Sequence, residues 1–565
     1  MVTRGSQVAV LAGILAACES PARVKPWRHA PDPTSEAAGV PSSPILADRA
    51  GEPDIRANRA HTLRIHLDVE PGRLNPLVAP TLWGRRITLG PIFETLIRDG
   101  QGGFHPRLAR SWRVMPGGLE IRIELEPDAT FSDGHALTTS DVQFTLDAIR
   151  DPHRGIDHLR PMLDDVEAIE LITSREIRLR LKRPSGWVLR ALAEIPILPM
   201  HVYDGSLLGG GQLVGTGPYK LASNKGGVVH LVRNDKYWGG PVAIADIELV
   251  YQPDAALALT AAKRGELDII PALIPAHWPA QPYSPGLAAA FVPLRLAPPR
   301  MRYLAFNARH APLDDANVRH ALGLLIDRAS IAKRVFSGLA RPAVWPIWPG
   351  GPVDGAEAPI PDFDPAAAGR LLDAAHWTDS DKDGYRDQNG KPLKLVLIGA
   401  ERATPKDNAG PAVKTERDFF VDAARKSGVM IEVKTGGEAW LEHRIADGNF
   451  DLVEESWAGM VDSDMTPLLG ALRLRPSKDA KEDVGPLRAT SPRIDRALDA
   501  MGAAWDPAER AKLAGELAAA LAEVWPLAGI VAEAPQGLVH KRVKGVRVFD
   551  GWIDLGALSF DTTVP

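Results

Sequence analysis

Residues 301–340, MRYLAFNARHAPLDDANVRHALGLLIDRASIAKRVFSGLA, combine signals for one strand, one turn and two helices. The apolar residues from Tyr303 to Phe306 predict the strand, and Pro312 predicts the turn that ends it. Asp314 and Asp315 can then begin a helix, because their carboxylates accept hydrogen bonds from the free N–H groups of a first helical turn.

Two helices are expected after this turn. The first carries apolar residues at helical spacing, which give it one buried face: Val318, Ala321, Leu322 and Leu325. The second begins at Asp327, buries Ile331 and Val335, and ends near Gly338. Glycine suits that position because it tolerates the left-handed conformation found after many helices. The local pattern is therefore strand, turn, helix, helix.

This stretch also resembles a recurring pattern of the family 5 extracellular solute-binding proteins. These are the peptide-, nickel- and oligopeptide-binding lipoproteins that serve ABC importers. The pattern is a strand ending in F-N, a P-L-x-D turn, V-R-x-A-L and I-D-R, found here at residues 306–307, 312–315, 318–322 and 326–328. In that family it marks the start of the second lobe.

Other family patterns occur in the same order along the chain. They include L-N-P at 74–76, I-F-E-x-L at 92–96, P-x-L-A-x-S-W at 106–112, F-S-D-G-x-x-L-T-x-x-D-V at 131–142 and G-T-G-P-Y at 215–219. The resemblance spans about residues 63–558. It implies an α/β fold of two lobes, the class II periplasmic-binding-protein-like fold with an extra inserted domain.

The resemblance and the composition together predict the domain boundaries. Lobe I is expected to be discontinuous, because the inserted domain and lobe II interrupt it. The predicted parts are a lipoprotein signal peptide (1–17), a Pro-rich tether (18–60), lobe I (61–85, 201–298 and 525–565), the inserted domain (86–200) and lobe II (299–524).

Length and composition agree with a globular protein of several domains. The 565 residues are too many for one hydrophobic core, and 45% of them are hydrophobic while 24% are charged. The net charge of −5, from 66 basic and 71 acidic side chains, gives no basic excess for nucleic-acid binding. No apolar run reaches the about 18 residues that a membrane-spanning helix needs.

The only cysteine indicates how the chain is anchored. Cys18 follows an apolar stretch, and L-A-A-C at 15–18 resembles the lipobox of bacterial lipoproteins, whose cysteine receives a lipid. We therefore expect an extracytoplasmic protein held to a bacterial membrane by lipid at Cys18. The alternative is an ordinary secretory signal. Glu19, the residue after the cysteine, leaves inner and outer membrane both open.

The sequence carries no motif of a known hydrolase or metalloenzyme. It lacks HExxH, GxSxG and paired CxxC motifs, and its 15 histidines show no ligand spacing. Asp462 and Asp464 could form an acid–base pair, but the resemblance places this segment beside the ligand cleft, where binding is favoured over catalysis. We expect no enzymatic activity, no cofactor and no resident metal.

An acidic loop at residues 379–390 partly matches an EF-hand. Asp379, Asp381 and Asp383 occupy ligand positions 1, 3 and 5, and Asp387 occupies position 9. Position 12 is Gly390 rather than glutamate, and no helix pair flanks the loop. A structural turn is therefore favoured over a calcium site.

Four tryptophans are the main candidates for ligand binding, because solute sites use aromatic side chains on loops between lobes. Trp83 follows the first predicted strand. Trp345 and Trp348 lie in a Pro/Gly-rich loop, and Trp457 follows a predicted strand at 450–453, where the family has its cleft tryptophan. Local packing is the alternative for each.

One position departs from the peptide-binding relatives. They carry an aspartate three residues after the cleft tryptophan, and it pairs with the free α-amino group of the peptide. Here that position is Met460, and a buried ammonium without a partner would be costly. Asp462 or Glu455 could replace the aspartate. Otherwise the ligand is a blocked peptide, a sugar, a metal chelate or another small molecule.

We expect a monomeric substrate-binding lipoprotein of an ABC importer, which binds a peptide or other small organic solute in an interlobe cleft and delivers it to the permease. A ligand-sensing or partner-binding lipoprotein of the same fold is the first alternative. A hydrolase acting in the cleft is the second.

Overall fold

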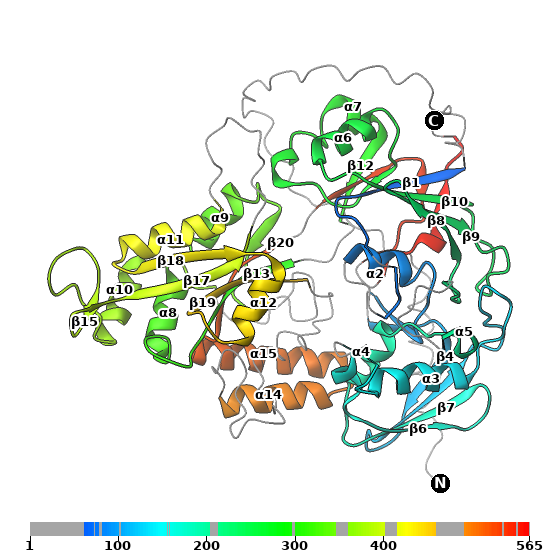
Figure 1. The fold of residues 1–565 in the computed structure, drawn as a ribbon, viewed down its shortest axis with the longest axis horizontal. Coiled ribbons are helices and arrows are strands. Elements are labelled where there is room, and N and C mark those ends of the chain that lie inside the picture. The colour runs from blue at the N-terminus through cyan, green and yellow to red at the C-terminus, as the bar shows by residue number, and fades with distance from the viewer. Residues whose placement is uncertain are drawn as a thin grey trace, which may run out of the picture. The chain divides into compact units, whose positions relative to one another are not determined.

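The computed structural model describes residues 61–563 with gaps, all within one compact unit, Pro53–Pro565. The gaps are 73, 78–81, 101–102, 155, 157–158, 204–212, 296–299, 346–359, 402–414, 459–490, 534–535 and 550–551. None of the described helices is both long enough and apolar enough to cross a membrane. The described residues form three main sheets, each with its own helices (Figure 1).

The first lobe is built on a seven-stranded sheet in the order β12-β21-β11-β1-β10-β9-β8. Every residue of its strand β1 (Thr62–Leu67) is buried, and β1 pairs in parallel with β10 (Asp246–Tyr251). The other strands are β8 (Tyr219–Lys225), β9 (Val228–Arg233), β11 (Ile269–Ile270), β12 (Phe291–Leu294) and β21 (Gly537–His540). Helices α6 (Ala255–Lys263) and α7 (Pro285–Ala290) accompany them.

The second lobe is built on a six-stranded sheet in the order β14-β20-β13-β19-β17-β18. Its strands are β13 (Arg300–Phe306), β14 (Ala340–Pro342), β17 (Lys394–Ala400), β18 (Met430–Gly436), β19 (Leu452–Ala458) and β20 (Leu527–Glu533). Its helices are α8 (Ala316–Leu324), α9 (Arg328–Arg334), α10 (Pro365–Ala374), α11 (Glu416–Lys426), α12 (Glu438–Ala446), α14 (Pro492–Ala503) and α15 (Pro507–Val524).

Strand β20 corrects the predicted boundary of the second lobe. The sequence assigned all of 525–565 to lobe I, but β20 pairs with β13 and β14 inside the six-stranded sheet. After β20 the chain returns to the first sheet, where β21 pairs with β11 and β12. A run of strand-forming residues predicts a strand without indicating which sheet receives it, because pairing partners are distant in sequence.

The inserted domain contains a four-stranded antiparallel sheet in the order β4-β5-β7-β6. These strands are β4 (Ala109–Val114), β5 (Glu120–Leu125), β6 (Val166–Leu171) and β7 (Glu176–Leu181). Its helices include α3 (Thr139–Arg150), α4 (Trp187–Glu194) and α5 (Met200–Tyr203). The predicted capping box of α3 is present, with the Thr138 backbone N–H donating to Asp141 Oδ2 at 2.9 Å.

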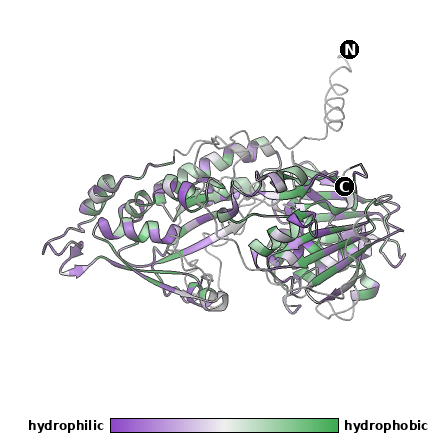
Figure 2. Cartoon of the chain, turned by 90° about the horizontal axis from the view of Figure 1, so that it is seen from above, coloured by the Kyte–Doolittle hydropathy of each residue, from purple (hydrophilic) through white to green (hydrophobic). Residues whose placement is uncertain are grey.

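The remaining elements are short. They are α2 (Leu82–Thr88), β2 (Ile97–Gly100), β3 (Gly103–Pro106), β15 (Asp387–Gln388), β16 (Lys391–Pro392), β22 (Val543–Lys544), β23 (Val548–Phe549), β24 (Trp552–Ile553) and β25 (Ser559–Phe560), with 3-10 turns at 160–163, 275–277 and 555–557. Most helices contain both hydrophobic and hydrophilic residues (Figure 2), as expected of helices with one buried face.

Glu94 joins the inserted domain to the first lobe. Its carboxylate is buried and forms an ion pair with Arg107 at 2.5 Å. It also accepts hydrogen bonds from the Tyr237 hydroxyl at 2.7 Å and from Trp238 Nε1 at 2.8 Å. One buried charge therefore holds segments from three parts of the chain, and each of its contacts is charge-assisted.

The helix starts predicted after the first strand of lobe II are confirmed. Asp315 begins α8 and accepts a hydrogen bond from the Asn317 backbone N–H at 2.7 Å. Asp327 begins α9 and accepts one from the Ser330 backbone N–H at 3.0 Å. Both carboxylates satisfy N–H groups that a first helical turn leaves free.

The arginines of this stretch bind main-chain carbonyls. Arg328 is 3% exposed, and its guanidinium donates to the carbonyls of Gly529 at 2.8 Å and Gly323 at 3.1 Å. Burial lowers its pKa to about 10, so it stays protonated at neutral pH. Arg319 donates to the carbonyls of Leu313 at 2.6 Å and Trp525 at 3.0 Å. The two side chains thus attach α8 and α9 to β20 and to the end of α15.

Trp525 packs directly onto α8. A Cβ atom on Gly323 would lie 2.1 Å from Cζ3 of the Trp525 ring. The ring cannot move away easily, because His320 stacks on it at 4.6 Å and Trp345 meets it edge-on at 5.3 Å. Gly323 is therefore needed for a close approach within a helix, where glycine otherwise costs stability.

Replacing Gly323 with alanine should destabilise the second lobe by about 1–3 kcal/mol, because the added methyl group overpacks the Trp525 contact. Gly369→Ala in α10 is the matched control. There the added Cβ would meet only the end of the flexible Arg386 side chain, at 3.2 Å, and alanine should leave stability unchanged or raise it by up to about 1 kcal/mol. Thermal denaturation of both variants measures the difference, and equal melting temperatures would contradict this account.

Glu194 at the end of α4 holds helix α2 in place. Its carboxylate accepts from Arg85 of α2 at 2.9 Å and from Arg190 of α4 at 2.6 Å. Burial alone would raise the pKa of Glu194, but the guanidinium groups of Arg190 and Arg85 outweigh burial and lower it from 4.5 to about 2. The folded state therefore favours the charged carboxylate more strongly than the unfolded chain does.

This shift predicts a pH dependence of stability. The contribution of Glu194, about 3 kcal/mol, is fully present above pH 5 and is lost as the pH falls towards 2. Glu194→Gln should lower the melting temperature at pH 7, and the deficit should shrink at pH 3. Glu167→Gln, which removes an exposed ion pair with Arg180, should have little effect at either pH. A deficit of the same size at both pH values would show that the charge of Glu194 is not responsible.

Candidate ligand-binding site

Helix α2 places Trp83 and Arg86 one turn apart, so that both side chains lie on one face of the helix. Trp83 lies in this helix rather than in the loop expected from the sequence. It is 5% exposed, and its Nε1 donates to Asp68 Oδ1 at 2.6 Å. Asp68 directly follows β1, so the indole is fixed to the end of a buried strand.

The guanidinium of Arg86 lies against two indole rings. Its Cζ is 5.0 Å from the ring centroid of Trp83 and 4.5 Å from that of Trp552 in β24. The two rings meet edge-on, with centroids 5.2 Å apart and an interplanar angle of 85°. Cation–π attraction favours this arrangement, the more so because the groups are buried. We call Asp68, Trp83, Arg86 and Trp552 the Trp83 cluster.

The pKa of Arg86, in the Trp83 cluster, is affected by a charged residue of the second lobe. Burial lowers the pKa of Arg86 to about 10; the Asp68 carboxylate opposes this shift, and the Arg300 guanidinium adds to it. Arg86 therefore stays cationic at neutral pH. Arg300 is the first residue of β13, so positive charges of both lobes act on the same region.

The strand register brings Trp457 to this end of the second sheet. Arg300 pairs with Ala458, and Met301 pairs with Trp457, across β13 and β19. The sequence predicted a strand at 450–453 followed by Trp457. In the structure Trp457 lies within the longer strand β19. Of the predicted tryptophans that the structure describes, Trp83 packs against Arg86, and the backbone of Trp457 pairs with Met301, next to Arg300.

Trp345 has a different role in the structure. It is 4% exposed and packs against Trp525 in the hydrophobic core of the second lobe. This is the local packing that the sequence left open as the alternative to ligand binding. The other predicted binding residues, Trp348, Met460 and Asp462, lie outside the described residues, as does Cys18.

Charged side chains line the neighbouring part of the second sheet. Arg302 of β13 forms ion pairs with Glu533 of β20 and, at 2.9 Å, with Glu416 of α11. Arg417 pairs with Glu454 of β19 at 2.5 Å. Two guanidinium groups thus bind three carboxylates, and these ion pairs link β13, β19 and β20 to α11.

The acidic loop has the hydrogen bonds of a turn. Asp379 Oδ2 accepts from the Gly384 backbone N–H at 3.2 Å, and Asp387 Oδ2 accepts from the Ser380 backbone N–H at 2.9 Å. Oxygens of Asp379, Asp381 and Asp383 lie within 4.8 Å of one another on the surface. These hydrogen bonds give the loop the form of a turn, and the choice of a structural turn over a calcium site stays a prediction.

Sequence reasoning missed Arg86 and Trp552. If residues 82–88 had been recognised as a helix, the three-residue spacing would have placed Arg86 on the same face as Trp83. Trp552 gave no signal, because it joins the cluster from the opposite end of the chain.

Comparison with known proteins supports the fold and identifies the family. The model of the bacterial extracellular solute-binding proteins, family 5, middle region, matches residues 103–477. Protein XP55 of Streptomyces lividans is 28% identical over 522 residues, which cover 88% of each chain. The nickel-binding periplasmic protein of Escherichia coli is 24% identical, over 79% of this chain and 84% of the relative.

A solved structure shares the architecture. It is the periplasmic oligopeptide-binding protein of an oligopeptide ABC transporter from Thermotoga maritima, with mannohexaose bound. It superposes with a TM-score of 0.68 and 20% identity, over 86% of this chain and 93% of the other. With two lobes, an inserted domain and a family model matching well over half of its residues, this chain belongs to the family 5 bacterial extracellular solute-binding proteins.

Proposed function

We propose that this solute-binding protein captures a peptide or another small organic solute between its two lobes and delivers it to an ABC permease. The observation that carries the proposal is the placement of the Trp83 cluster, which lies in the first lobe and is influenced by Arg300 of the second. One of the named relatives is a nickel-binding protein and another is an oligopeptide-binding protein with mannohexaose bound, so the solute class of this chain is not fixed by its family.

The geometry suggests how binding drives closure. A ligand that contacts both lobes stabilises the state in which they are together, and the importer recognises that state. Trp83 and Trp552 hold the Arg86 guanidinium in place, and Arg86 with Arg300 supplies positive charge from both lobes. These features favour a solute that carries a carboxylate or another negative group at this position.

Met460 bears on the choice of solute. A methionine cannot neutralise the α-amino group of a free peptide, whereas the positive charge of Arg86 and Arg300 attracts a carboxylate in this region. The preferred ligands are therefore an anionic solute, such as an N-blocked peptide, or an anionic chelate. This preference rests on residues 86 and 300 of the described chain and on the identity of residue 460.

The protein should carry a ligand from the cell when it is purified without denaturation. Native mass spectrometry is expected to show a discrete added mass. That mass should be lost in Trp457→Ala, because the indole is proposed to contact the solute. Trp112→Ala is the matched control: this half-buried tryptophan lies on β4 of the inserted domain, and the variant should retain the mass.

Two outcomes would count against the proposal. One is a bare mass that stays bare after incubation with pools of peptides, sugars and metal chelates. It would favour a sensor or partner-binding role for the same fold. The other is equal ligand retention by the Trp457 and Trp112 variants, which would place the solute elsewhere.

We further propose that lipid at Cys18 tethers the protein to a bacterial membrane after removal of a signal peptide, and that the protein acts as a monomer. The support is the L-A-A-C sequence at 15–18 and the Pro-rich segment that follows. Such a tether allows the binding domains to reach a permease in the same membrane.

Cys18→Ala should abolish lipid attachment, because no other cysteine is available. Metabolic labelling with a radioactive fatty acid should mark the parent protein and leave the variant unlabelled, and the variant should move to the soluble fraction. Ser20→Ala, two residues away, serves as the control and should remain labelled. Labelling of the Cys18 variant would show that the anchor is elsewhere.

A further inference from the structure

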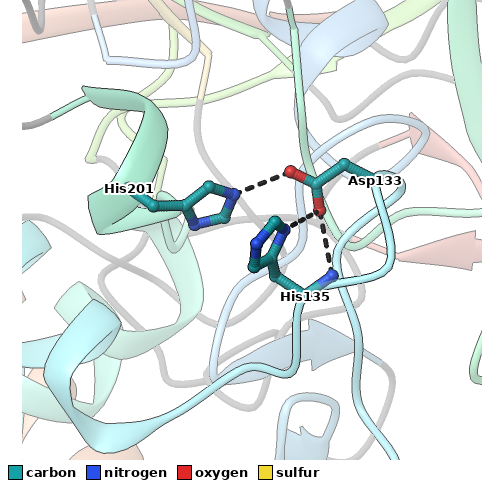
Figure 3. A group of neighbouring side chains, drawn as sticks. All are labelled: Asp133, His135 and His201. Carbon is teal, nitrogen blue, oxygen red and sulfur yellow. Dashed lines mark hydrogen bonds and ion pairs between the residues drawn. The ribbon is translucent and has the colours of Figure 1, made fainter.

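Two histidines and an aspartate meet on the surface of the inserted domain (Figure 3). His201 Nε2 lies 2.7 Å from Asp133 Oδ2, and His135 Nδ1 lies 3.2 Å from Asp133 Oδ1. The two imidazole rings face one another with centroids 4.0 Å apart. All three residues offer a ligand atom, and these atoms lie within 4.8 Å of one another.

The three side chains come from two segments, the turn at 131–135 and helix α5. Asp133 and His135 flank Gly134 in a tight turn, in which the Phe131 backbone N–H donates to the His135 carbonyl at 2.8 Å. Gly134 has a φ of +98°, a conformation that favours glycine. The His135 backbone N–H also donates to Asp133 Oδ1 at 3.1 Å. The turn thus presents one carboxylate and one imidazole on the same side.

Helix α5 brings the third ligand. Its first residue, Met200, donates its backbone N–H to Asp141 Oδ1 at 3.0 Å, which ties α5 to the start of α3. The preceding segment is fixed by the Leu198 N–H donating to Thr145 Oγ1, also at 3.0 Å. Phe131 packs edge-on against His201, with ring centroids 6.0 Å apart. His201 is therefore held by anchors independent of Asp133.

This donor set suits a divalent transition-metal ion. Imidazole nitrogen and carboxylate oxygen are ligands of zinc, at about 2.0–2.2 Å from the metal. In a tetrahedral site two such ligand atoms lie about 3.3 Å apart. The 3.2 Å between His135 and Asp133 already matches this spacing, and the 2.7 Å between His201 and Asp133 requires only a small opening.

Exposure of the group supports an open site. The side chains of Asp133, His135 and His201 are 29%, 64% and 35% exposed. An ion can reach them from solvent, and water can complete the coordination shell. The competing interpretation is that the aspartate only holds the two imidazoles by hydrogen bonds, which would fix the turn without any metal.

We propose that Asp133, His135 and His201 form a binding site for one divalent transition-metal ion of the zinc type, distinct from the solute site between the lobes. The ion joins the 131–136 turn to α5 and thereby clamps the inserted domain. The site does not depend on the proposed transport function, because Asp133 and His135 belong to the inserted domain and His201 lies at its predicted end, in α5, which is tied to α3.

Isothermal titration of the full chain with zinc chloride tests the site. The parent protein should bind one more equivalent of zinc than His201→Ala or Asp133→Asn, or bind it at least about tenfold more tightly. His153→Ala removes another exposed histidine of the same domain and should bind like the parent. Zinc should also raise the melting temperature of the parent and of the control, and should do so less for the two site variants.

The outcomes separate this site from others in the chain. Zinc held equally by the parent and by both site variants would overturn the proposal and place the ion elsewhere, for example in the solute site. Absence of zinc binding by the parent would overturn it as well. If His201→Ala is poorly folded without metal, His135→Ala on the exposed turn provides the same comparison. A normal melting temperature of the metal-free variant then assigns lost binding to the missing ligand.

Discussion

Arg319 and Arg328 bind the main chain of the second lobe with buried guanidinium groups. Arg328 reaches carbonyls of α8 and β20, and Arg319 reaches the carbonyls before α8 and after α15. Burying a cation is costly unless its hydrogen bonds are made, and here four separate segments supply the acceptors. The second sheet is therefore held together by side chains from one short stretch. Gly323 belongs to the same stretch and permits the contact with Trp525 that brings the end of α15 close.

A similar use of charge positions the candidate site. Glu94 joins Arg107 of the inserted domain to Tyr237 and Trp238 of the first lobe, and Glu194 connects α4 to α2. Helix α2 in turn carries Trp83 and Arg86. The site thus depends on ion pairs that lie behind it rather than on the flexibility of a surface loop. Arg300 of the second lobe lowers the pKa of Arg86, although less than burial does.

Much of this architecture could be predicted from local sequence, since caps and turns are set by neighbours. The starts of α8 and α9 at Asp315 and Asp327 and the capping box at Thr138 follow from such rules. Sheet membership could not be predicted this way, because β20 pairs with residues more than 200 positions earlier. The same limit applies to the site: Trp552 meets Trp83 only in the folded chain, and Trp345 is buried by Trp525, 180 positions away.

The placement of β20 and β21 affects how the chain matures. Strand β20 lies inside the second sheet and β21 inside the first, although both come from the last 40 residues. Neither sheet can be completed until residues 527–540 have emerged, more than 200 residues after the strands β13 and β11 with which they pair, and such distant pairings form slowly. A chain with the proposed signal peptide must pass through a membrane channel before it folds. Late completion of both sheets would keep it in an export-competent state during that passage, and a stop before β20 would leave each of the two sheets without one of its strands.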